Sequence, residues 1–193
     1  MRATRTVGVE RARRRDEFAR LLVDERRRSL LEAGSGPGRD AVAFMSAGLA
    51  VTGVDLSAEH VRIAQGAGVD ALQASVLDLP FSTRSFDAAW SMSTLLHIPN
   101  VLFDRAMSEI VRVVRPGSPI AVGLWGGPDS EGPNERDTIQ PQRFFSIRSD
   151  ERVRAMLDAH GELERFDTWT EPGTEGLHYQ FVLLRTGRMS AIR

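Results

Sequence analysis

The residues best suited to chemistry lie in one stretch of the chain, from Leu30 to Asp40. An apolar run ends in the carboxylate of Glu32, and three glycines follow at alternate positions, 34, 36 and 38. Such glycines let the main chain turn sharply and let a ligand approach N–H groups that a Cβ would cover. If a strand enters this turn and a helix leaves it, a ligand binds over the carboxyl end of the strand, beside the helix N-terminus. A glycine cluster alone more often marks an ordinary loop, so the elements around it decide its meaning.

Composition narrows the classes of function. With 193 residues, 41% of them hydrophobic and 26% charged, the chain is predicted to form one soluble globular domain. It contains no cysteine, which excludes disulfides, Cys-ligated metals and thiol nucleophiles. All 25 basic residues are arginine, so Schiff-base chemistry and a P-loop lysine are also excluded. The net charge of −1 argues against a nucleic-acid partner or an anionic membrane partner.

The location of the protein is predicted from its amino end. No apolar run approaches the roughly 18–20 residues that cross a bilayer. The arginine-rich start lacks the apolar core of a secretory signal, and the acidic residues Glu10, Asp16 and Glu17 argue against a transit peptide. We therefore expect a cytoplasmic protein.

Apolar periodicity predicts strands that alternate with helices. We expect residues 1–9 to be disordered and a helix to cover 10–28, with strands over 29–33, 49–54, 69–75, 86–91 and 119–125. Between these strands the pattern indicates helices over 39–47, from Ser57 to about Gly66, and from Leu102 to Val113. Strands separated by helices at this spacing form right-handed crossovers and a parallel sheet.

The last third of the sequence has a different character. Residues 126–147 form a long, irregular stretch with three prolines, and we expect a lid loop there because connections of this length are usually functional. Ser149 is a good N-cap for a further helix. Strands are then predicted over 163–169 and 177–184. The loop between them is too short for a helical crossover, so this pair should be antiparallel.

Five motifs follow one another in register. They are Glu32 to Gly38, Val54 to Ser57, Asp78 to Phe81 with Ser85 to Asp87, Leu95 to Pro99, and Val113 to Gly117. Together they resemble the class I S-adenosylmethionine-dependent methyltransferases, of the small "type 11" kind, over residues 29 to 185. The resemblance implies an α/β fold, a Rossmann-like, doubly wound, seven-stranded sheet that is mostly parallel with an antiparallel C-terminal strand, in a single domain over 1–193. It also implies S-adenosylmethionine as cofactor and in-line methyl transfer to a small-molecule acceptor.

The resemblance also assigns residues to the cofactor. Glu32 would meet its ammonium group, and Asp55 would accept both ribose hydroxyls. Alternatively, Glu32 caps the strand end and Asp55 caps the next helix, although Ser57 already supplies a cap. The family usually has a carboxylate for the adenine amino group where this chain has Ser75, and this departure predicts weaker adenine binding. The full set of expected cofactor contacts is Glu32, Gly34, Ser35, Gly36, Asp55, Leu56, Ser75, Val76, Ser91 and Met92.

The sequence gives fewer indications of the residues that would contact the methyl acceptor. His97 is the candidate general base, although a local packing or hydrogen-bonding role is an equal alternative. Relatives often carry a longer N-terminal lid, so residues 126–147 would enclose the substrate here, with Trp125, Phe144 and Phe145; the two phenylalanines equally suit packing under the last helix. No His, Asp or Glu cluster has metal-ligand spacing, and no metal is expected.

Other functions fit the sequence less well. The dinucleotide fingerprint Gly-x-Gly-x-x-Gly would place bulky Arg39 where strand and helix must touch, which disfavours an NAD(P)-dependent oxidoreductase. Residues 91–94 lack the Asn/Asp-Pro-Pro-aromatic signature of enzymes that methylate an extruded base, and no basic stripe follows the chain. A cofactor-binding protein without transferase activity stays open. The sequence does not indicate the acceptor or the oligomeric state.

Overall fold

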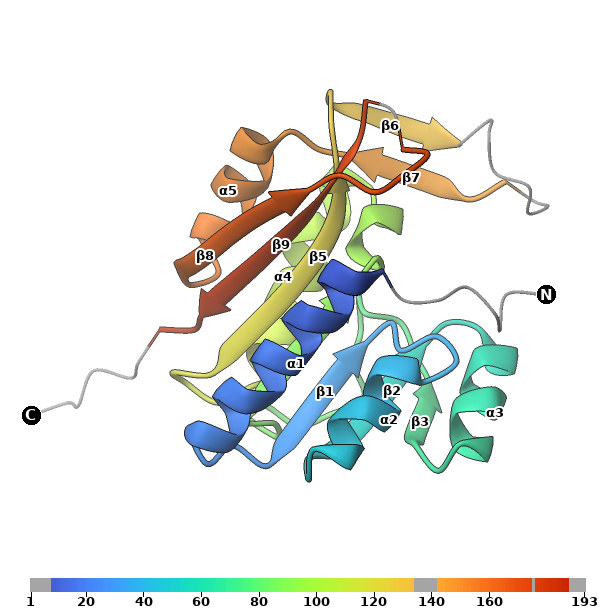
Figure 1. Cartoon of the computed structure of the whole chain (residues 1–193), viewed down its shortest axis with the longest axis vertical. Coiled ribbons are helices and arrows are strands. Elements are labelled where there is room, and N and C mark those ends of the chain that lie inside the picture. Colours follow the sequence, from blue (N-terminus) through green and yellow to red (C-terminus); the bar gives the residue numbers. More distant parts are fainter. Residues whose placement is uncertain (1–7, 134–141, 175, 188–193) are drawn as a thin grey trace, which may run out of the picture.

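One mixed sheet forms the centre of the protein (Figure 1). The computed structural model describes residues 8–133, 142–174 and 176–187. In that part of the chain the strand order is β3-β2-β1-β4-β5-β9-β8. The strands are β1 (Ser29–Ala33), β2 (Ala50–Asp55), β3 (Asp70–Gln73), β4 (Ala88–Met92), β5 (Pro119–Gly126), β8 (Glu162–Trp169) and β9 (His178–Arg185). Strands β1 to β5 pair in parallel, and β9 runs antiparallel to both of its neighbours. The predicted seven-stranded sheet with an antiparallel C-terminal strand is confirmed.

The central strands have the composition that a sheet covered on both faces requires. Every residue of β4 is buried, and so is every residue of β1 except Ser29 and of β5 except Trp125. A strand buried on both faces reads as a continuous apolar run without alternation. Because β1, β2 and β4 run parallel, their carboxyl ends lie at the same edge of the sheet, where the glycine turn begins.

Helices cover the two faces of the sheet (Figure 1). On one face lie α1 (Val9–Asp24), α2 (Arg39–Ser46) and α3 (Ala58–Gly66); on the other lie α4 (Asn100–Val113) and α5 (Asp150–Asp158), while a 3₁₀ turn, η1 (Leu95–His97), leads into α4. The predicted caps are present, because Ser57 accepts from the N–H of His60 and Ser149 from that of Arg152, both at 3.3 Å. Helix α1 ends at Asp24 rather than at residue 28, since Arg26 adopts a left-handed φ of 57° that cannot continue a helix.

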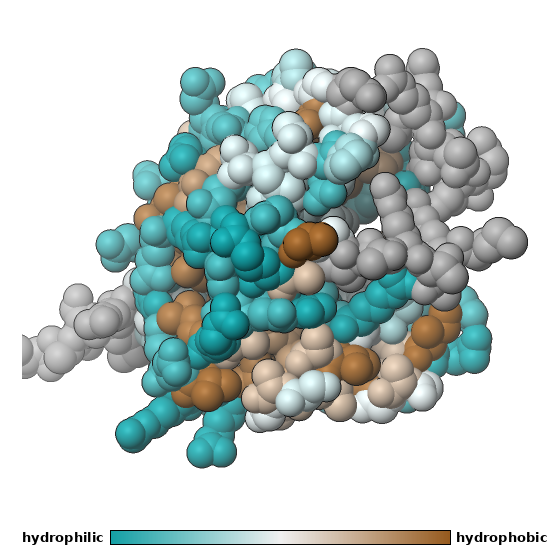
Figure 2. Space-filling view, in the orientation of Figure 1, coloured by the Kyte–Doolittle hydropathy of each residue, from teal (hydrophilic) through white to brown (hydrophobic). Residues whose placement is uncertain are grey.

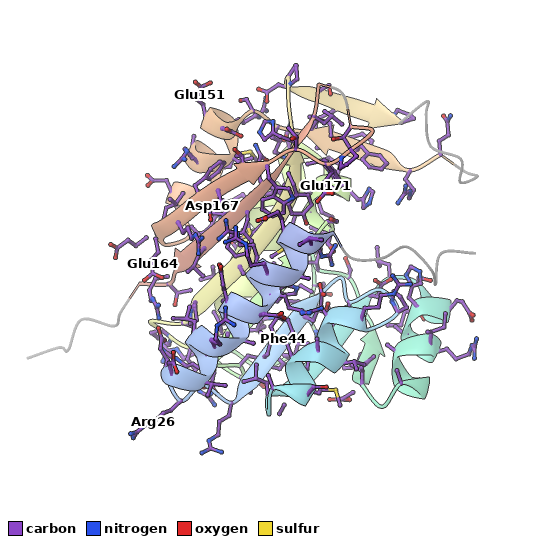
Figure 3. All side chains as sticks on the ribbon, viewed as in Figure 1. Arg26, Phe44, Glu151, Glu164, Asp167 and Glu171 are labelled. Atoms are coloured by element: carbon purple, nitrogen blue, oxygen red, sulfur yellow. The ribbon has the colours of Figure 1, made fainter. Side chains whose placement is uncertain are left out.

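An aromatic cluster packs α1 and α2 on the middle of the sheet. Trp90 of β4 is fully buried, and its ring lies 5.4 Å from that of Phe18 in α1 and 5.2 Å from that of Phe44 in α2. Phe44 is labelled in Figure 3, where it lies between the two helices. Aromatic pairs at these separations stabilise beyond the area they bury, by about 1 kcal/mol each. The cluster therefore fixes α1 against the sheet edge that carries the glycine turn.

The prediction of an irregular stretch over 126–147 was wrong in its described part. Strands β6 (Ser130–Pro133) and β7 (Phe144–Ile147) form an antiparallel pair, and residues 134–141 lie outside the described residues. Contacts distant in sequence hold this pair in place. The Ser146 hydroxyl donates to the main-chain oxygen of Ile98 at 3.0 Å, and Glu131 accepts from the main-chain N–H of Asn100 at 2.6 Å. Local propensity carries no sign of such contacts, which explains the error.

The face of the molecule seen in Figure 2 varies in polarity. Figure 2 shows hydrophilic side chains over α1, whereas hydrophobic ones gather over α2, where Val42 and Met45 are exposed. Among the described residues, no helix combines the length and the apolar character that a membrane crossing needs.

Asp87 joins the starts of β1 and β4. Its carboxylate accepts from the main-chain N–H groups of Arg28 and Ser29 at 2.9 and 3.0 Å, from the Ser29 hydroxyl at 3.0 Å, and from the Arg115 guanidinium. Burial alone raises the pKa of Asp87, but these four hydrogen bonds outweigh burial and lower it. The charged form is therefore the one that the folded chain stabilises.

We predict that Asp87→Asn lowers the free energy of unfolding at pH 7 by about 2 kcal/mol, because the bonds to a charged acceptor are weakened. The folded pKa lies below the unfolded one, so this contribution is present above the unfolded pKa and is lost as the pH falls through the folded pKa. Urea denaturation of both proteins across this acid range measures the difference. A difference that does not shrink toward acid would contradict the assignment.

Candidate active site

The turn after β1 is closed at one glycine and open at another. Gly34, Gly36 and Gly38 all have positive φ, of 80°, 53° and 79°, which favours glycine at each position. A Cβ on Gly34 would collide with the side chain of Thr94, which follows β4. A Cβ on Gly36 would meet nothing within 4 Å. The turn is thus packed against the end of β4 on one side and has open space above Gly36.

The N–H groups of this turn bond within the chain. Those of Gly34 and Ser35 both donate to the main-chain oxygen of Val54, at 2.8 and 2.9 Å, and that of Gly36 donates to Asp55 Oδ2 at 2.8 Å. We expected main-chain groups of Gly34 and Gly36 to receive the ligand. The N–H groups of both glycines join β1 to β2, and the binding of a ligand by main-chain groups of this turn stays a prediction.

Asp55 joins the glycine turn to the start of α3 through its carboxylate. Besides Gly36, its carboxylate accepts from the main-chain N–H of Ser57 at 2.8 Å through Oδ1, and His60 Nδ1 lies 3.4 Å from the same oxygen. The sequence offered helix capping and hydroxyl binding as alternatives. A carboxylate oxygen has two lone pairs, so Asp55 can hold the turn and still accept hydroxyl groups.

Glu32 is a buried carboxylate with an unused oxygen. It accepts from the main-chain N–H of Ala41 in the first turn of α2, while its Oε2 atom is buried and has no hydrogen-bond partner among the residues that the structure describes. Burial first, and then the charge of Asp40, raise its pKa well above the ordinary value, and Arg11 only partly opposes them. A buried carboxylate oxygen without a donor fits a cationic ligand group.

Arg11 and Asp40 were not predicted from the sequence as site residues. Asp40 is buried, accepts from Arg11 Nη2 at 2.7 Å, and accepts from the Trp90 indole N–H at 3.2 Å. Arg11 comes from α1, which carries several arginines, so the sequence pattern alone does not single it out. Its charge acts on both buried carboxylates, and Arg15 also pairs with Asp40 at 3.5 Å.

Two serines predicted to face the ligand face the sheet instead. A Cβ on Gly53 would lie 2.8 Å from Ser35 Oγ, so the Ser35 side chain is directed at β2. The Ser91 hydroxyl donates to the main-chain oxygen of Ala33 at 2.9 Å, fully buried between β4 and β1. The Ser91 hydroxyl is thus occupied within the sheet, and a contact of this residue with the ligand stays a prediction. Met92 does reach the edge, where its sulfur lies 3.8 Å from the Tyr179 hydroxyl.

The predicted adenine side lies at the ends of β2 and β3. Leu56 is 68% exposed there, which leaves its side chain free to cover a flat ring. Val76 is buried, and Ser75 Oγ accepts from the main-chain N–H of Leu77 at 3.2 Å. Ser75 thus has a local turn role, and its contact with adenine stays a prediction.

His97 lies under the β6–β7 pair. Its Nδ1 is 2.8 Å from the main-chain oxygen of Phe144, and its ring lies 4.6 Å from that of Phe145. Since a carbonyl oxygen only accepts, Nδ1 carries the proton and Nε2 is the basic nitrogen. The structure thus brings together His97 and the two predicted substrate phenylalanines. Trp125 lies elsewhere, with its ring 5.3 Å from that of Tyr179.

A separate cavity of about 360 Å³ lies between α1 and α2. Its lining includes Asp16 and Arg20 of α1 together with Phe44 of α2. None of the expected cofactor contacts lines it.

The chain is similar to known methyltransferases. Residues 31–122 match the family model described as "Methyltransferase domain". The chain is 34% identical over 128 residues to "O-methyltransferase rstn1" of Aspergillus nomiae, covering 61% of this chain and 55% of that protein. It is 34% identical over 108 residues to the malonyl-[acyl-carrier protein] O-methyltransferase of Salmonella typhimurium, covering 55% and 42%. The chain thus spans about half the length of the curated relatives it matches.

A solved structure shares the fold over nearly the whole chain. The 1,6-didemethyltoxoflavin-N1-methyltransferase of Burkholderia thailandensis, with bound 1,6-didemethyltoxoflavin and S-adenosylhomocysteine, aligns with a TM-score of 0.71 at 24% identity. The alignment covers 97% of this chain and 93% of that one. This likeness shows that the chain has the fold of a methyltransferase, and residues 31–122 match the methyltransferase domain model.

Proposed function

We propose that this protein transfers a methyl group from S-adenosylmethionine to an oxygen atom of a small molecule. The observation that carries the proposal is the buried, unpartnered Oε2 of Glu32 next to a glycine turn that is open at Gly36 and bordered by Asp55. The names of the curated O-methyltransferase relatives support oxygen as the attacking atom.

The residues present fit the cofactor. Glu32 offers its free oxygen to the ammonium group of the amino-acid end, and Asp55 offers its remaining lone pairs to the ribose hydroxyls. Leu56, Val76 and Ser75 would border the adenine. When bound, the cofactor supplies a methyl group on a sulfonium cation.

The protein's own task is to align the acceptor and to keep water away. Helix α1 covers the ends of β1 and β4 on one side, through Phe18 and Arg11. The β6–β7 pair covers η1 and holds His97 by a hydrogen bond of 2.8 Å. His97 is the candidate for the base that takes up the proton of an acceptor hydroxyl during methyl transfer. A cytoplasmic location and the lack of a nucleic-acid partner stay predictions from the sequence.

Asp55→Ala should weaken the binding of S-adenosylhomocysteine by about one to two decades, because two hydroxyls lose a charged acceptor and Gly36 loses the bond that holds the turn. Isothermal titration calorimetry measures the change. Asp70→Ala is the matched control, since Asp70 lies at the opposite end of the neighbouring strand and bonds only Thr52 among the contacts seen. Equal affinities for the Asp55 and Asp70 variants would place the ribose elsewhere.

Glu32→Gln should stabilise the ligand-free protein and weaken its binding of the cofactor product. The raised folded pKa of Glu32 means that folding becomes less favourable as the pH rises from the unfolded pKa to the folded one. Glutamine does not ionise, so the variant lacks this destabilisation. Its free energy of unfolding should exceed that of the wild type by an amount that grows from pH 5 to pH 8.

The same substitution should reduce S-adenosylhomocysteine affinity about tenfold, since an ammonium group loses a charged partner. Urea denaturation and calorimetry at both pH values test the two effects in one pair of proteins. A variant that is less stable than the wild type at both pH values, with unchanged affinity, would show that Glu32 only caps α2.

A further inference from the structure

The end of β4 faces two different sets of side chains. Thr94 lies against Gly34 of the glycine turn, whereas the hydroxyl of Ser93 lies 3.0 Å from that of Tyr179 in β9. Consecutive residues thus contact the expected cofactor turn on one side and an aromatic group on the other. Because in-line transfer needs donor and acceptor in contact, the reacting atoms must meet near this point.

Ser93 has a strained main chain. Its φ of 57° is unusual for a residue other than glycine, and such a conformation costs about 1–3 kcal/mol. Two contacts hold it: its N–H donates to the main-chain oxygen of Gly123 at 2.8 Å, and its hydroxyl meets Tyr179. Strain of this kind is concentrated at functional sites.

Gly123 makes room for the tyrosine hydroxyl. A Cβ at this position would lie 2.5 Å from Tyr179 Oη and would also collide with the sulfur of Met92. Tyr179 is buried, and burial raises its pKa, so its hydroxyl keeps the proton at neutral pH. Ser93 Oγ and Tyr179 Oη share one hydrogen bond of 3.0 Å in which either can be the donor, and Tyr179 Oη also lies 3.8 Å from Met92 Sδ. In either direction Ser93 Oγ keeps at least one lone pair for another donor.

Two indole rings flank this hydroxyl pair. The Trp125 ring stands edge-on to Tyr179 at 5.3 Å, and the Trp169 ring lies tilted by 33° at 4.9 Å. Both tryptophans are only partly buried, unlike Trp90. The Trp169 N–H donates to Glu171, which lies beside the amino end of α1 (Figure 3). Flat aromatic surfaces next to one polar pair favour a flat, conjugated ligand.

We infer that Ser93 Oγ, held by Tyr179, accepts a hydrogen bond from the hydroxyl group of a flat, phenol-like acceptor that packs against Trp125 and Trp169, while the proton itself leaves to a separate base when the methyl group is transferred. This arrangement aims the lone pair of the acceptor oxygen at the methyl group instead of at the protein. The inference rests on the proposed function and adds to it the class of acceptor and the group that positions it. Ser93 touches the acceptor, and Tyr179 is a positioning residue.

The test uses 7-hydroxycoumarin, a fluorescent phenol, below its own pKa and with the protein saturated with S-adenosylhomocysteine. The wild type should bind it, and Tyr179→Phe and Ser93→Ala should each weaken binding by about five- to tenfold. The double variant should be no weaker than the poorer single one, because both residues act through one contact. Trp169→Leu should weaken binding as well, and Thr168→Ala, on the exposed side of the same strand, should not.

A second ligand separates positioning from stability. With 7-methoxycoumarin, which has no hydroxyl proton, the two hydroxyl variants should bind as the wild type does. Their S-adenosylhomocysteine affinity should be unchanged too. Equal losses for both coumarins, or no binding of 7-hydroxycoumarin by the loaded wild type, would overturn the inference. Failure of the wild type to bind S-adenosylhomocysteine would instead overturn the proposed function.

Discussion

Two buried carboxylates beside arginines of α1 set the geometry of this site. Glu32 lies near the end of β1 and Asp40 in the first turn of α2, and both are buried. Arg11 and Arg15 pair with Asp40 at 2.7 and 3.5 Å, but Arg11 only partly offsets the desolvation of the Glu32 carboxylate, whose pKa stays raised. Carboxylates buried together with too little positive charge destabilise the empty protein. A cationic ligand group at Glu32 would relieve that cost, so ligand binding and the position of α1 are coupled.

The glycine turn is required by close packing at the end of β1. It must pass between Thr94 and the end of β2, and only a residue without Cβ fits at Gly34. Once there, the chain uses its N–H groups to bond Val54 and Asp55 and presents an open face at Gly36. Asp55 thereby links the shape of the turn to the place where hydroxyl groups can be held. The fold supplies these parts in a fixed order along one sheet edge, as open α/β sheets do for their ligands.

The sheet and the glycine turn could be predicted because they depend on local patterns. Apolar runs, caps and loop length sufficed for the alternation of strands and helices and for the antiparallel C-terminal pair, and the family resemblance supplied the seven-stranded sheet. The direction of individual side chains could not be predicted, because it depends on contacts distant in sequence. Ser91 bonds Ala33, and Ser35 faces Gly53. The β6–β7 pair was missed for the same reason, since its anchors lie around η1. Tyr179 could have been singled out as the sole tyrosine, but only packing shows that it meets Ser93.

A crystal structure of the complex with S-adenosylhomocysteine tests the central claim most directly. The account predicts density over the glycine turn, with the ribose hydroxyls within hydrogen-bond distance of Asp55 and the ammonium group beside Glu32 Oε2. Density in the cavity between α1 and α2, or a ribose that no carboxylate approaches, would contradict it.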